Sequence, residues 1–310
     1  MLAAWAASAA LARGFERGGV HCLQLPVADG GEGTAEALFS ALDGAWGEVE
    51  VSDPLLRPVN ARFLRTPTGL VVVESAEAIG LWRLAPAERD PLSASSRGLG
   101  ELIAAACEGG ARELVVALGG SATVDGGAGL REVLTELPVP TRAACDVANP
   151  LLGERGAARA FGPQKGASPA DVEELERRLA AMSELAPYAD QPGAGAAGGL
   201  GAALAGLGGE LVPGAPLVLE AIGFREKVKG AALVVTGEGE VDRTTAEGKA
   251  PGAVASVCAE EGIRCVVFGG RVVEPLTGVE TRALSGDPRR AEEDLLELGE
   301  ELARPLASPR

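Results

Sequence analysis

Short apolar runs recur along the chain, and each ends in or near a glycine-rich loop. Runs of four to eight Val- and Leu-rich residues bounded by glycine are typical of buried strands. They predict strands at residues 20–27, 70–74, 113–120, 231–239 and 265–270. Because the runs are apolar throughout instead of alternating, they indicate parallel sheets with helices on both faces.

Helical patterns lie between these predicted strands. In SPADVEELERRLAAMSELA, Ser168 is a candidate N-cap and Pro169 takes the first helical position. One apolar stripe follows at helical spacing: Val172, Leu175, Leu179 and Met182. The opening MLAAWAASAALARGFERGG predicts a helix that ends at glycine, and it lacks the leading basic residues of a signal peptide. The alternation predicts an α/β fold.

Length and charge then limit the partners. A chain of 310 residues is long enough for two domains, each with its own core. The formal net charge is −16, from 44 acidic and 28 basic residues, so the surface repels phosphate backbones and anionic lipids. We therefore expect no nucleic-acid partner and no membrane partner. An anionic substrate would need a local cluster of backbone amides, a few basic side chains and a divalent cation.

The cysteines and the histidine argue against several catalytic classes. Five cysteines are scattered without a CxxC pair, and His21 is the only histidine, within a strand-like run. A zinc site, a disulfide framework and a Ser-His-Asp or Cys-His arrangement are therefore not expected. Scattered thiols of this kind indicate buried apolar residues in a reducing, cytoplasmic compartment.

Five glycine-rich loops carry the candidate chemistry, at residues 29–34, 119–129, 161–167, 192–204 and 236–249. The first, second and fifth follow predicted strands, the position where open α/β sheets bind ligands. Glycines let backbone amides approach an anion closely, and neighbouring carboxylates can hold a metal.

Two familiar nucleotide motifs do not explain these loops. The run GAGAAG at 193–198 satisfies G-x-G-x-x-G, but it follows YADQP and not a strand. Gly248 and Lys249 precede Ala250, where a Walker A loop would have Ser or Thr.

Together, the loops resemble the type I glycerate kinases. The resemblance covers about residues 20–270 and rests on these blocks in order: ADGGEGT, GGSATVDGGAG, ACDVANPLLG, FGPQKGA, PGAGAAGGLGAAL, LVVTGEGEVD and GKAPGAVA. It implies a cytoplasmic enzyme that uses ATP and Mg²⁺ to phosphorylate glycerate, most often to 2-phosphoglycerate. Phosphoryl transfer needs positioning and charge neutralisation, which explains why neither histidine nor cysteine is required.

The resemblance also implies a domain organisation. A flavodoxin-like (Rossmann-like) parallel-sheet domain is interrupted by a second α/β domain, with the active site in the cleft between them. We expect the first domain at residues 1–47 plus 228–310 and the inserted domain at 48–227. Members of the family usually begin with a strand and an APDSFKGS-type loop. Met1 lies in what would be the following helix, so this strand and loop are expected to be absent from the chain.

Site roles follow from the resemblance and from the chemistry of the residues. The catalytic candidates are Asp29, Glu32, Asp125, Lys165 and Asp242. The nucleotide-binding candidates are Gly119, Gly120, Ser121, Thr123, Gly237, Glu238 and Gly239. The metal candidates are Asp125, Glu238 and Asp242. The alternative at each position is an ordinary turn or a solvated loop charge.

Within these sets, each charged residue has an expected task. Asp125 would hold Mg²⁺ or meet the attacking hydroxyl, and Glu238 and Asp242 would be metal or base carboxylates. Asp29 and Glu32 would bind the glycerate hydroxyls or act as the base, and Lys165 would meet the charge on the γ-phosphate. Two other interpretations stay open: a degenerate homologue without activity, and a kinase of another small hydroxy acid. The sequence also leaves a homodimer open.

Overall fold

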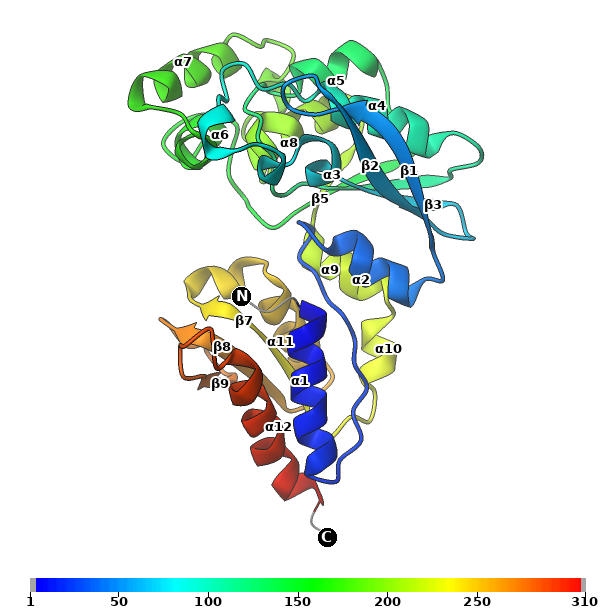
Figure 1. Cartoon of the computed structure of the whole chain (residues 1–310), viewed down its shortest axis with the longest axis vertical. Helices are drawn as coiled ribbons and strands as arrows, with labels where there is room; N and C mark the ends of the chain where they lie inside the picture. The colour runs from blue at the N-terminus through cyan, green and yellow to red at the C-terminus, as the bar shows by residue number, and fades with distance from the viewer. Residues whose placement is uncertain (1–3, 308–310) are drawn as a thin grey trace. The chain divides into compact units, whose positions relative to one another are not determined.

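The computed structural model describes residues 4–307, and their contacts divide the chain into two compact units (Figure 1). The discontinuous unit contains the residues up to 27 and from 219 onward, and the inserted unit contains residues 28–218. The α/β fold class is confirmed. The expected boundaries at 47 and 228 differ from this division, because α2 (Thr34–Ala41) packs against strands β2 and β3 of the inserted unit.

The inserted unit is built on a six-stranded sheet in the order β1-β2-β3-β4-β5-β6. The strands are β1 (Ala45–Ser52), β2 (Pro58–Arg65), β3 (Leu70–Glu74), β4 (Glu113–Ala117), β5 (Thr141–Cys145) and β6 (Glu210–Pro213). β1, β2 and β3 pair antiparallel, and β3 to β6 pair parallel. The sheet is therefore mixed, whereas the apolar runs had predicted parallel strands.

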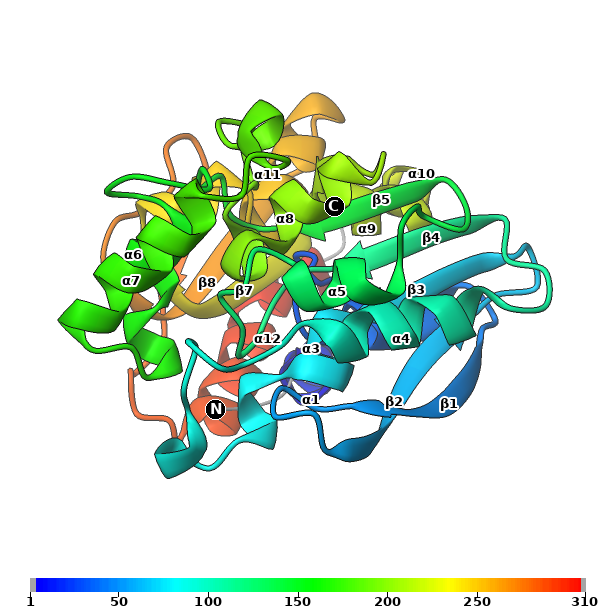
Figure 2. The same cartoon turned by 90° about the horizontal axis from the view of Figure 1, so that it is seen from above.

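Helices of the inserted unit pack on this sheet and on one another. They are α3 (Ser75–Ile79), α4 (Arg97–Cys107), α5 (Ala128–Val133), α6 (Ala157–Phe161), α7 (Pro169–Ala180) and α8 (Ala196–Gly206), with 3₁₀ turns at Leu81–Arg83, Pro86–Glu88, Pro163–Lys165 and Ala186–Tyr188. α4 lies against β1, β2 and β3 and also packs on α5 (Figure 2). The core combines strand residues such as Val71 and Val116 with helix residues such as Leu99 and Leu102, all fully buried.

The discontinuous unit has a parallel three-stranded sheet in the order β7-β8-β9. Its elements are α1 (Ala4–Arg17), α10 (Phe224–Val228), β7 (Val234–Val241), a 3₁₀ turn at Arg243–Glu247, α11 (Ala250–Glu260), β8 (Cys265–Val272), β9 (Glu280–Ala283) and α12 (Ala291–Ala307); the unit boundary falls within α9 (Gly214–Ala221). Val266 and Phe268 of β8 pack with α1 and α12, while Val267 packs with Ala255 of α11. Helices thus cover both faces of this sheet.

The pairing of α1 with α12 depends on two glycines. A Cβ added at Gly14 would lie 2.9 Å from the Cα of Gly299, and the converse distance is also 2.9 Å. Real Cβ atoms do not approach so closely, so this helix crossing requires glycine on both helices.

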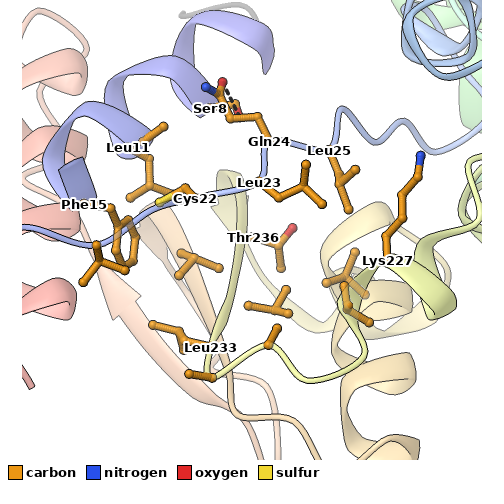
Figure 3. Close-up of a pocket in the computed structure, with 18 of the residues that line it drawn as sticks. Ser8, Leu11, Phe15, Cys22, Leu23, Gln24, Leu25, Lys227, Leu233 and Thr236 are labelled. Carbon is orange, nitrogen blue, oxygen red and sulfur yellow. Dashed lines mark hydrogen bonds between the residues drawn. The ribbon is translucent and has the colours of Figure 1, made fainter. Parts of the chain in front are cut away.

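Four of the five predicted strands are confirmed as β3, β4, β7 and β8. The strand predicted at 20–27 is wrong: these residues form an extended segment without strand pairing. Leu23, Leu25 and Cys22 of this segment line a pocket of about 360 Å³ together with Leu233 and Thr236 near the start of β7 (Figure 3). Within residues 4–307, β7 has only β8 as a hydrogen-bonded neighbour. A strand exists only through its ladder partner, and the described chain supplies none for this segment.

The predicted helix around residue 175 is confirmed as α7. The Ser168 hydroxyl accepts a hydrogen bond from the Asp171 N–H at 3.3 Å, and the Asp171 carboxylate accepts one from the Ser168 N–H at 2.9 Å. This is a reciprocal capping arrangement. Met182 lies beyond the helix end but packs in the same cluster as Leu175.

A separate observation concerns membranes. Among residues 4–307, each helix is too short or too polar to cross a bilayer.

Candidate functional site

The loop containing Asp29 and Glu32 lies against the loop that follows β4. A Cβ added at Gly119 would lie 2.7 Å from the Cα of Gly31, and one added at Gly120 would overlap the Glu32 carboxylate. The structure therefore brings these candidate residues together within the inserted unit. Because β4 and its neighbours are parallel, this is the carboxyl edge of the sheet, where α/β proteins bind ligands.

The other side of the Asp29 loop is packed just as closely. Gly30 has a φ of +96°, and a Cβ there would lie 2.7 Å from the Cα of Gly214 at the start of α9. Close backbone contacts on both sides hold the Asp29–Glu32 segment in one conformation.

Glu74, the last residue of β3, anchors the helix that follows this loop. Its carboxylate accepts hydrogen bonds from the backbone N–H groups of Gly33 and Ala35, the latter at 2.7 Å. The side chain is nearly buried, and this burial raises the pKa of Glu74 to about 7. A carboxylate at the start of α2 also interacts favourably with the helix dipole.

Ser75, the next residue, anchors the second loop. Its hydroxyl donates to the Gly119 carbonyl at 2.9 Å and accepts from the Gly119 N–H at 3.3 Å. Two adjacent residues at the end of β3 thus position both candidate loops. Sequence reasoning did not identify Glu74 or Ser75; the only local signal was their place at the carboxyl end of a predicted strand.

Lys165 is buried beneath the Ser121–Thr123 segment. Its ammonium donates to the Ser121 hydroxyl at 3.0 Å and to the Thr123 carbonyl at 2.7 Å. The residue is 3% exposed, and burial lowers the pKa of Lys165 to about 7. The structure therefore joins Lys165 to the predicted phosphate loop.

Two buried hydroxyls in this unit make no hydrogen bond within the described residues, Thr34 Oγ1 and Thr123 Oγ1. Thr34 is the first residue of α2, and Thr123 belongs to the loop that Lys165 supports. Orphaned buried hydroxyls are rare in proteins and are expected where a ligand or an ordered water completes the site.

Asp125 is already fully engaged by the protein. Its carboxylate accepts hydrogen bonds from Ser96 N at 2.8 Å, Ser96 Oγ at 2.7 Å, Gly127 N at 3.1 Å and Gly129 N at 3.2 Å. These bonds join the start of α5 to the N-cap of α4. In this structure the Asp125 carboxylate stabilises the N-termini of α4 and α5 against each other.

The remaining candidates lie in the discontinuous unit. The Glu238 carboxylate of β7 accepts from the Lys249 ammonium at 3.1 Å and from the Thr245 hydroxyl at 2.5 Å. Lys249 also lies 4.0 Å from the Asp242 carboxylate, whose pKa the Thr244 hydroxyl holds below its usual value. Glu238 and Asp242 are thus brought together around Lys249, which the sequence analysis placed in the GKAPGAVA block without a site role.

The predicted site residues therefore form two groups, one in each unit. The inserted unit holds Asp29, Glu32, Gly119, Gly120, Ser121, Thr123, Asp125 and Lys165, and the discontinuous unit holds Gly237, Glu238, Gly239 and Asp242. In the described part of the chain, no three or more His, Cys, Asp or Glu side chains are grouped to hold a metal. Glu238 and Asp242 place two carboxylates beside Lys249, and Mg²⁺ commonly takes one or two carboxylates and completes its shell with water and substrate phosphates.

Comparison with known proteins agrees with this description. A model of the glycerate kinase family matches residues 1–137 and 137–286. The chain is 42% identical to glycerate 2-kinase of Escherichia coli over 276 residues, which cover 76% of this chain and 72% of that protein. It is 38% identical to glycerate kinase of Halalkalibacterium halodurans over 306 residues, covering 85% and 80% of the two chains.

A solved structure is similar over nearly the whole chain. It is the crystal structure of a Salmonella typhimurium LT2 protein described as a glycerate kinase 2. The sequence identity is 33% and the TM-score is 0.84, with 98% of this chain and 94% of that chain covered. From its motifs, its fold and these relatives, the chain belongs to the glycerate kinase family.

Proposed function

We propose that this protein is a glycerate kinase that transfers the γ-phosphoryl group of ATP to a hydroxyl of glycerate, giving 2-phosphoglycerate and ADP. The observation that carries the proposal is the contact between the Asp29–Glu32 segment and the Gly119–Gly120 loop, in a member of this family. The two segments place carboxylates beside backbone amides, which suits a hydroxy acid on one side and a phosphoryl group on the other.

The proton balance assigns a task to the carboxylates. The glycerate hydroxyl oxygen forms a bond to the γ-phosphorus while the bond from phosphorus to the ADP oxygen breaks. The hydroxyl proton passes to the carboxylate of Asp29 or Glu32, the two acidic residues of this loop. Glu74 and Ser75 act as positioning residues, because each hydrogen-bonds one of the two loops and neither needs to touch substrate.

The phosphoryl group requires positive partners. The Lys165 ammonium donates hydrogen bonds to the Ser121 hydroxyl and the Thr123 carbonyl. It therefore supports the loop that faces the phosphate, and it adds positive charge there. Mg²⁺, when bound, supplies neutralisation of phosphate charge. Glu238 and Asp242 are the carboxylates that we propose to hold it, with Lys249 as a further partner for phosphate.

The state of the cysteines bears on the cellular setting. All five cysteines are free, with Cys145 and Cys258 buried, as is typical of a reducing compartment. We therefore propose a cytoplasmic location. A homodimer stays a prediction, to be measured by light scattering.

The test is an ADP-release assay with ATP and Mg²⁺ and, in turn, both enantiomers of glycerate, lactate and glycolate. We expect turnover with glycerate above every other acceptor, and phosphorus NMR of the product should show 2-phosphoglycerate. Turnover with another hydroxy acid but not with glycerate would show that the enzyme is a kinase of that acid. Pure, folded protein that releases no ADP with any acceptor would identify a degenerate homologue.

A further inference from the structure

The discontinuous unit contains a second pocket, of about 850 Å³, over the carboxyl halves of its three parallel strands. This volume falls within the range of roughly 300–1,000 Å³ that is typical of small-molecule sites. The pocket lies between the sheet and the first turns of α12, and Ala7 of α1 also lines it. Ligands of open α/β sheets bind at this end of the strands.

Most of the lining side chains at the α12 end are apolar. They include Phe268 and Val272 of β8, Leu284, Pro288, and Leu295 of α12. An apolar lining favours a flat aromatic group and disfavours phosphates, whose charge would lose its hydration there.

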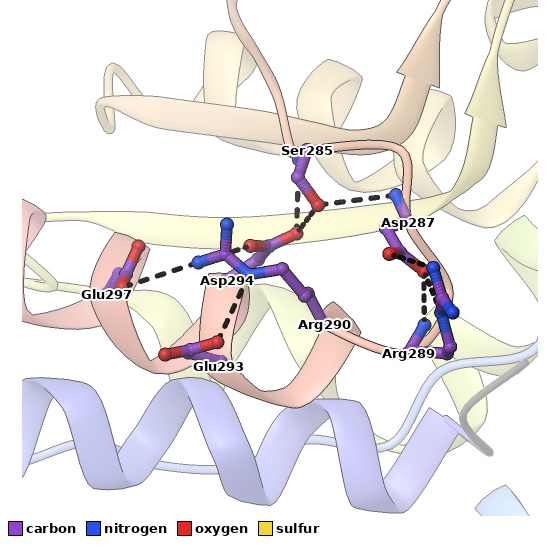
Figure 4. Close-up of polar contacts among 7 residues, drawn as sticks. All are labelled: Ser285, Asp287, Arg289, Arg290, Glu293, Asp294 and Glu297. Atoms are coloured by element: carbon purple, nitrogen blue, oxygen red, sulfur yellow. Dashed lines mark hydrogen bonds and ion pairs between the residues drawn. The ribbon is translucent and has the colours of Figure 1, made fainter.

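The charged side chains that line this pocket, besides Glu238, are Asp287, Asp294 and Arg271, and Arg271 is paired with Glu240. Asp294, which is nearly buried, accepts hydrogen bonds from the backbone N–H of Ser285 at 3.1 Å and from the Ser285 hydroxyl, and it is paired with Arg290 (Figure 4). Asp287 accepts from the Arg289 N–H at 3.0 Å. The first turn of α12 carries three carboxylates, Glu292, Glu293 and Asp294, of which Asp294 lines the pocket.

The carboxylates at the α12 end of the pocket favour the nucleoside part of a nucleotide over its phosphates. A helix start usually favours phosphate, but here acidic side chains already occupy the positive end of the helix and would repel it. Carboxylates on a pocket rim do suit neutral hydroxyl donors such as those of a ribose. The α12 end therefore suits the uncharged half of a nucleotide.

The β7 end of the pocket has features that suit phosphate. Gly237, Glu238 and Gly239 line it, and the Glu238 carboxylate accepts a hydrogen bond at 3.1 Å from the ammonium of Lys249, which lies outside the pocket lining. Lys249 directly precedes α11, a helix of 11 residues. Lys249 supplies a cation at this helix start, and Mg²⁺, when bound, would offset the Glu238 and Asp242 carboxylates beside it, so this end suits phosphate.

We propose that this pocket binds the purine nucleoside half of ATP, with the base over Phe268 and Leu295 and the ribose toward Ser285 and Asp287. The triphosphate then extends past Gly237–Gly239 toward Lys249. The inference rests on the proposed kinase function and adds to it where the nucleoside lies and which way the nucleotide runs.

The experiment uses Ala291→Trp, which places a large side chain in the pocket from the start of α12. Glu297→Trp, at an exposed position of the same helix, is the matched control. Calorimetric titrations with ATP, adenosine and inorganic tripolyphosphate, all with Mg²⁺, measure the two halves of the ligand separately. Ala283→Leu at the end of β9 is a second, milder pocket variant that carries the test if circular dichroism shows Ala291→Trp to be misfolded.

We expect adenosine to compete with ATP on the parent protein. We also expect the pocket variant to raise the Kd of ATP by about tenfold or more while leaving the Kd of tripolyphosphate unchanged. Parent-like ATP binding by the folded pocket variants, or no competition by adenosine, would overturn the proposal. Glycerate phosphorylation by the parent is measured in parallel. If it is absent while adenosine competes as expected, the proposed function fails and the nucleoside site stands.

Discussion

At the scale of single residues, the buried carboxylate of Glu74 is the most informative. It sits at the end of β3, is 7% exposed, and accepts backbone hydrogen bonds from the start of α2. Burial raises the pKa of Glu74 from its ordinary value of 4.5 to about 7. The folded protein therefore keeps a proton on Glu74 that the unfolded chain has already lost, and the associated stability is lost as pH rises from about 4.5 through 7.

This linkage makes Glu74→Gln a sharp test. The amide keeps an acceptor for the α2 amides but cannot ionise. We expect the variant to gain stability relative to the parent as pH rises, by up to about 3 kcal/mol between pH 4.5 and pH 8. Urea unfolding at a series of pH values measures the difference. Two curves that stay parallel over that window would contradict a raised pKa.

Asp29 and Glu32 belong to the same scale. If one of them accepts the substrate proton, Asp29→Asn or Glu32→Gln should lower kcat by about 100-fold or more, because an amide cannot act as the base. ATP binding should be unchanged, since neither residue is assigned to the nucleotide. Single-turnover rates and ATP titrations on both variants separate the two effects. Parent-like kcat in both would remove the proton-acceptor role from this loop.

Lys165 combines charge with support of a loop. Lys165→Met keeps the length and apolar stem of the side chain but removes the ammonium that holds Ser121 and Thr123. We expect kcat to fall by about tenfold or more, equivalent to roughly 1.4 kcal/mol of transition-state stabilisation. Lys229→Met, at an exposed lysine paired with Glu226, is the control. Equal kcat in the two variants would show that the Lys165 charge has no part in transfer.

At the scale of elements, the start of α8 shows what the glycine-rich run 192–204 does. Ala197, Gly198 and Gly199 have positive φ values of 51°, 76° and 95°. A Cβ at Gly198 would overlap the Thr123 carbonyl, the same carbonyl that accepts from Lys165. The run thus packs its backbone against the predicted phosphate loop.

This packing makes Gly198→Ala costly in two ways. The left-handed conformation costs about 1 kcal/mol for a residue with a Cβ, and the overlap adds about 1–3 kcal/mol. Gly208→Ala is the matched control, because Gly208 has a φ of +91° with no atom within 4 Å of an added Cβ. Thermal unfolding should show the larger loss for Gly198→Ala. Similar losses in the two variants would mean that the contact with Thr123 is readily relaxed.

At the scale of the whole molecule, net charge governs nucleotide binding. With a net charge of −16, the protein gives a polyphosphate no general attraction, and the described Glu238 and Asp242 carboxylates would repel it. We expect removal of divalent cations to weaken ATP binding by about tenfold or more. Titration of ATP in excess chelator and in excess Mg²⁺ measures this. Equal affinities would show that basic side chains alone accommodate the phosphates.

Local patterns in the sequence were sufficient for many of the elements. The apolar runs that became β3, β4, β7 and β8, and the capped stripe that became α7, depend on periodicity and on residues a few positions apart. Such signals are contained in the chain itself. The continuous apolar runs did not identify β1 or β2. Both strands are partly exposed and pair antiparallel, so polar residues interrupt their apolar positions.

The order of the glycine-rich motifs, and with it the family, can be read from the amino-acid sequence alone, because those motifs are contiguous stretches of chain. The tertiary structure decided which of them meet. Glu74 reaches Ala35 across 39 positions, Ser75 reaches Gly119 across 44, and Lys165 reaches Ser121 across 44. Tertiary structure also decided that residues 20–27 would not form a strand. Burial, pKa shifts and ladder partners all depend on residues distant in the chain, so no local pattern could determine them.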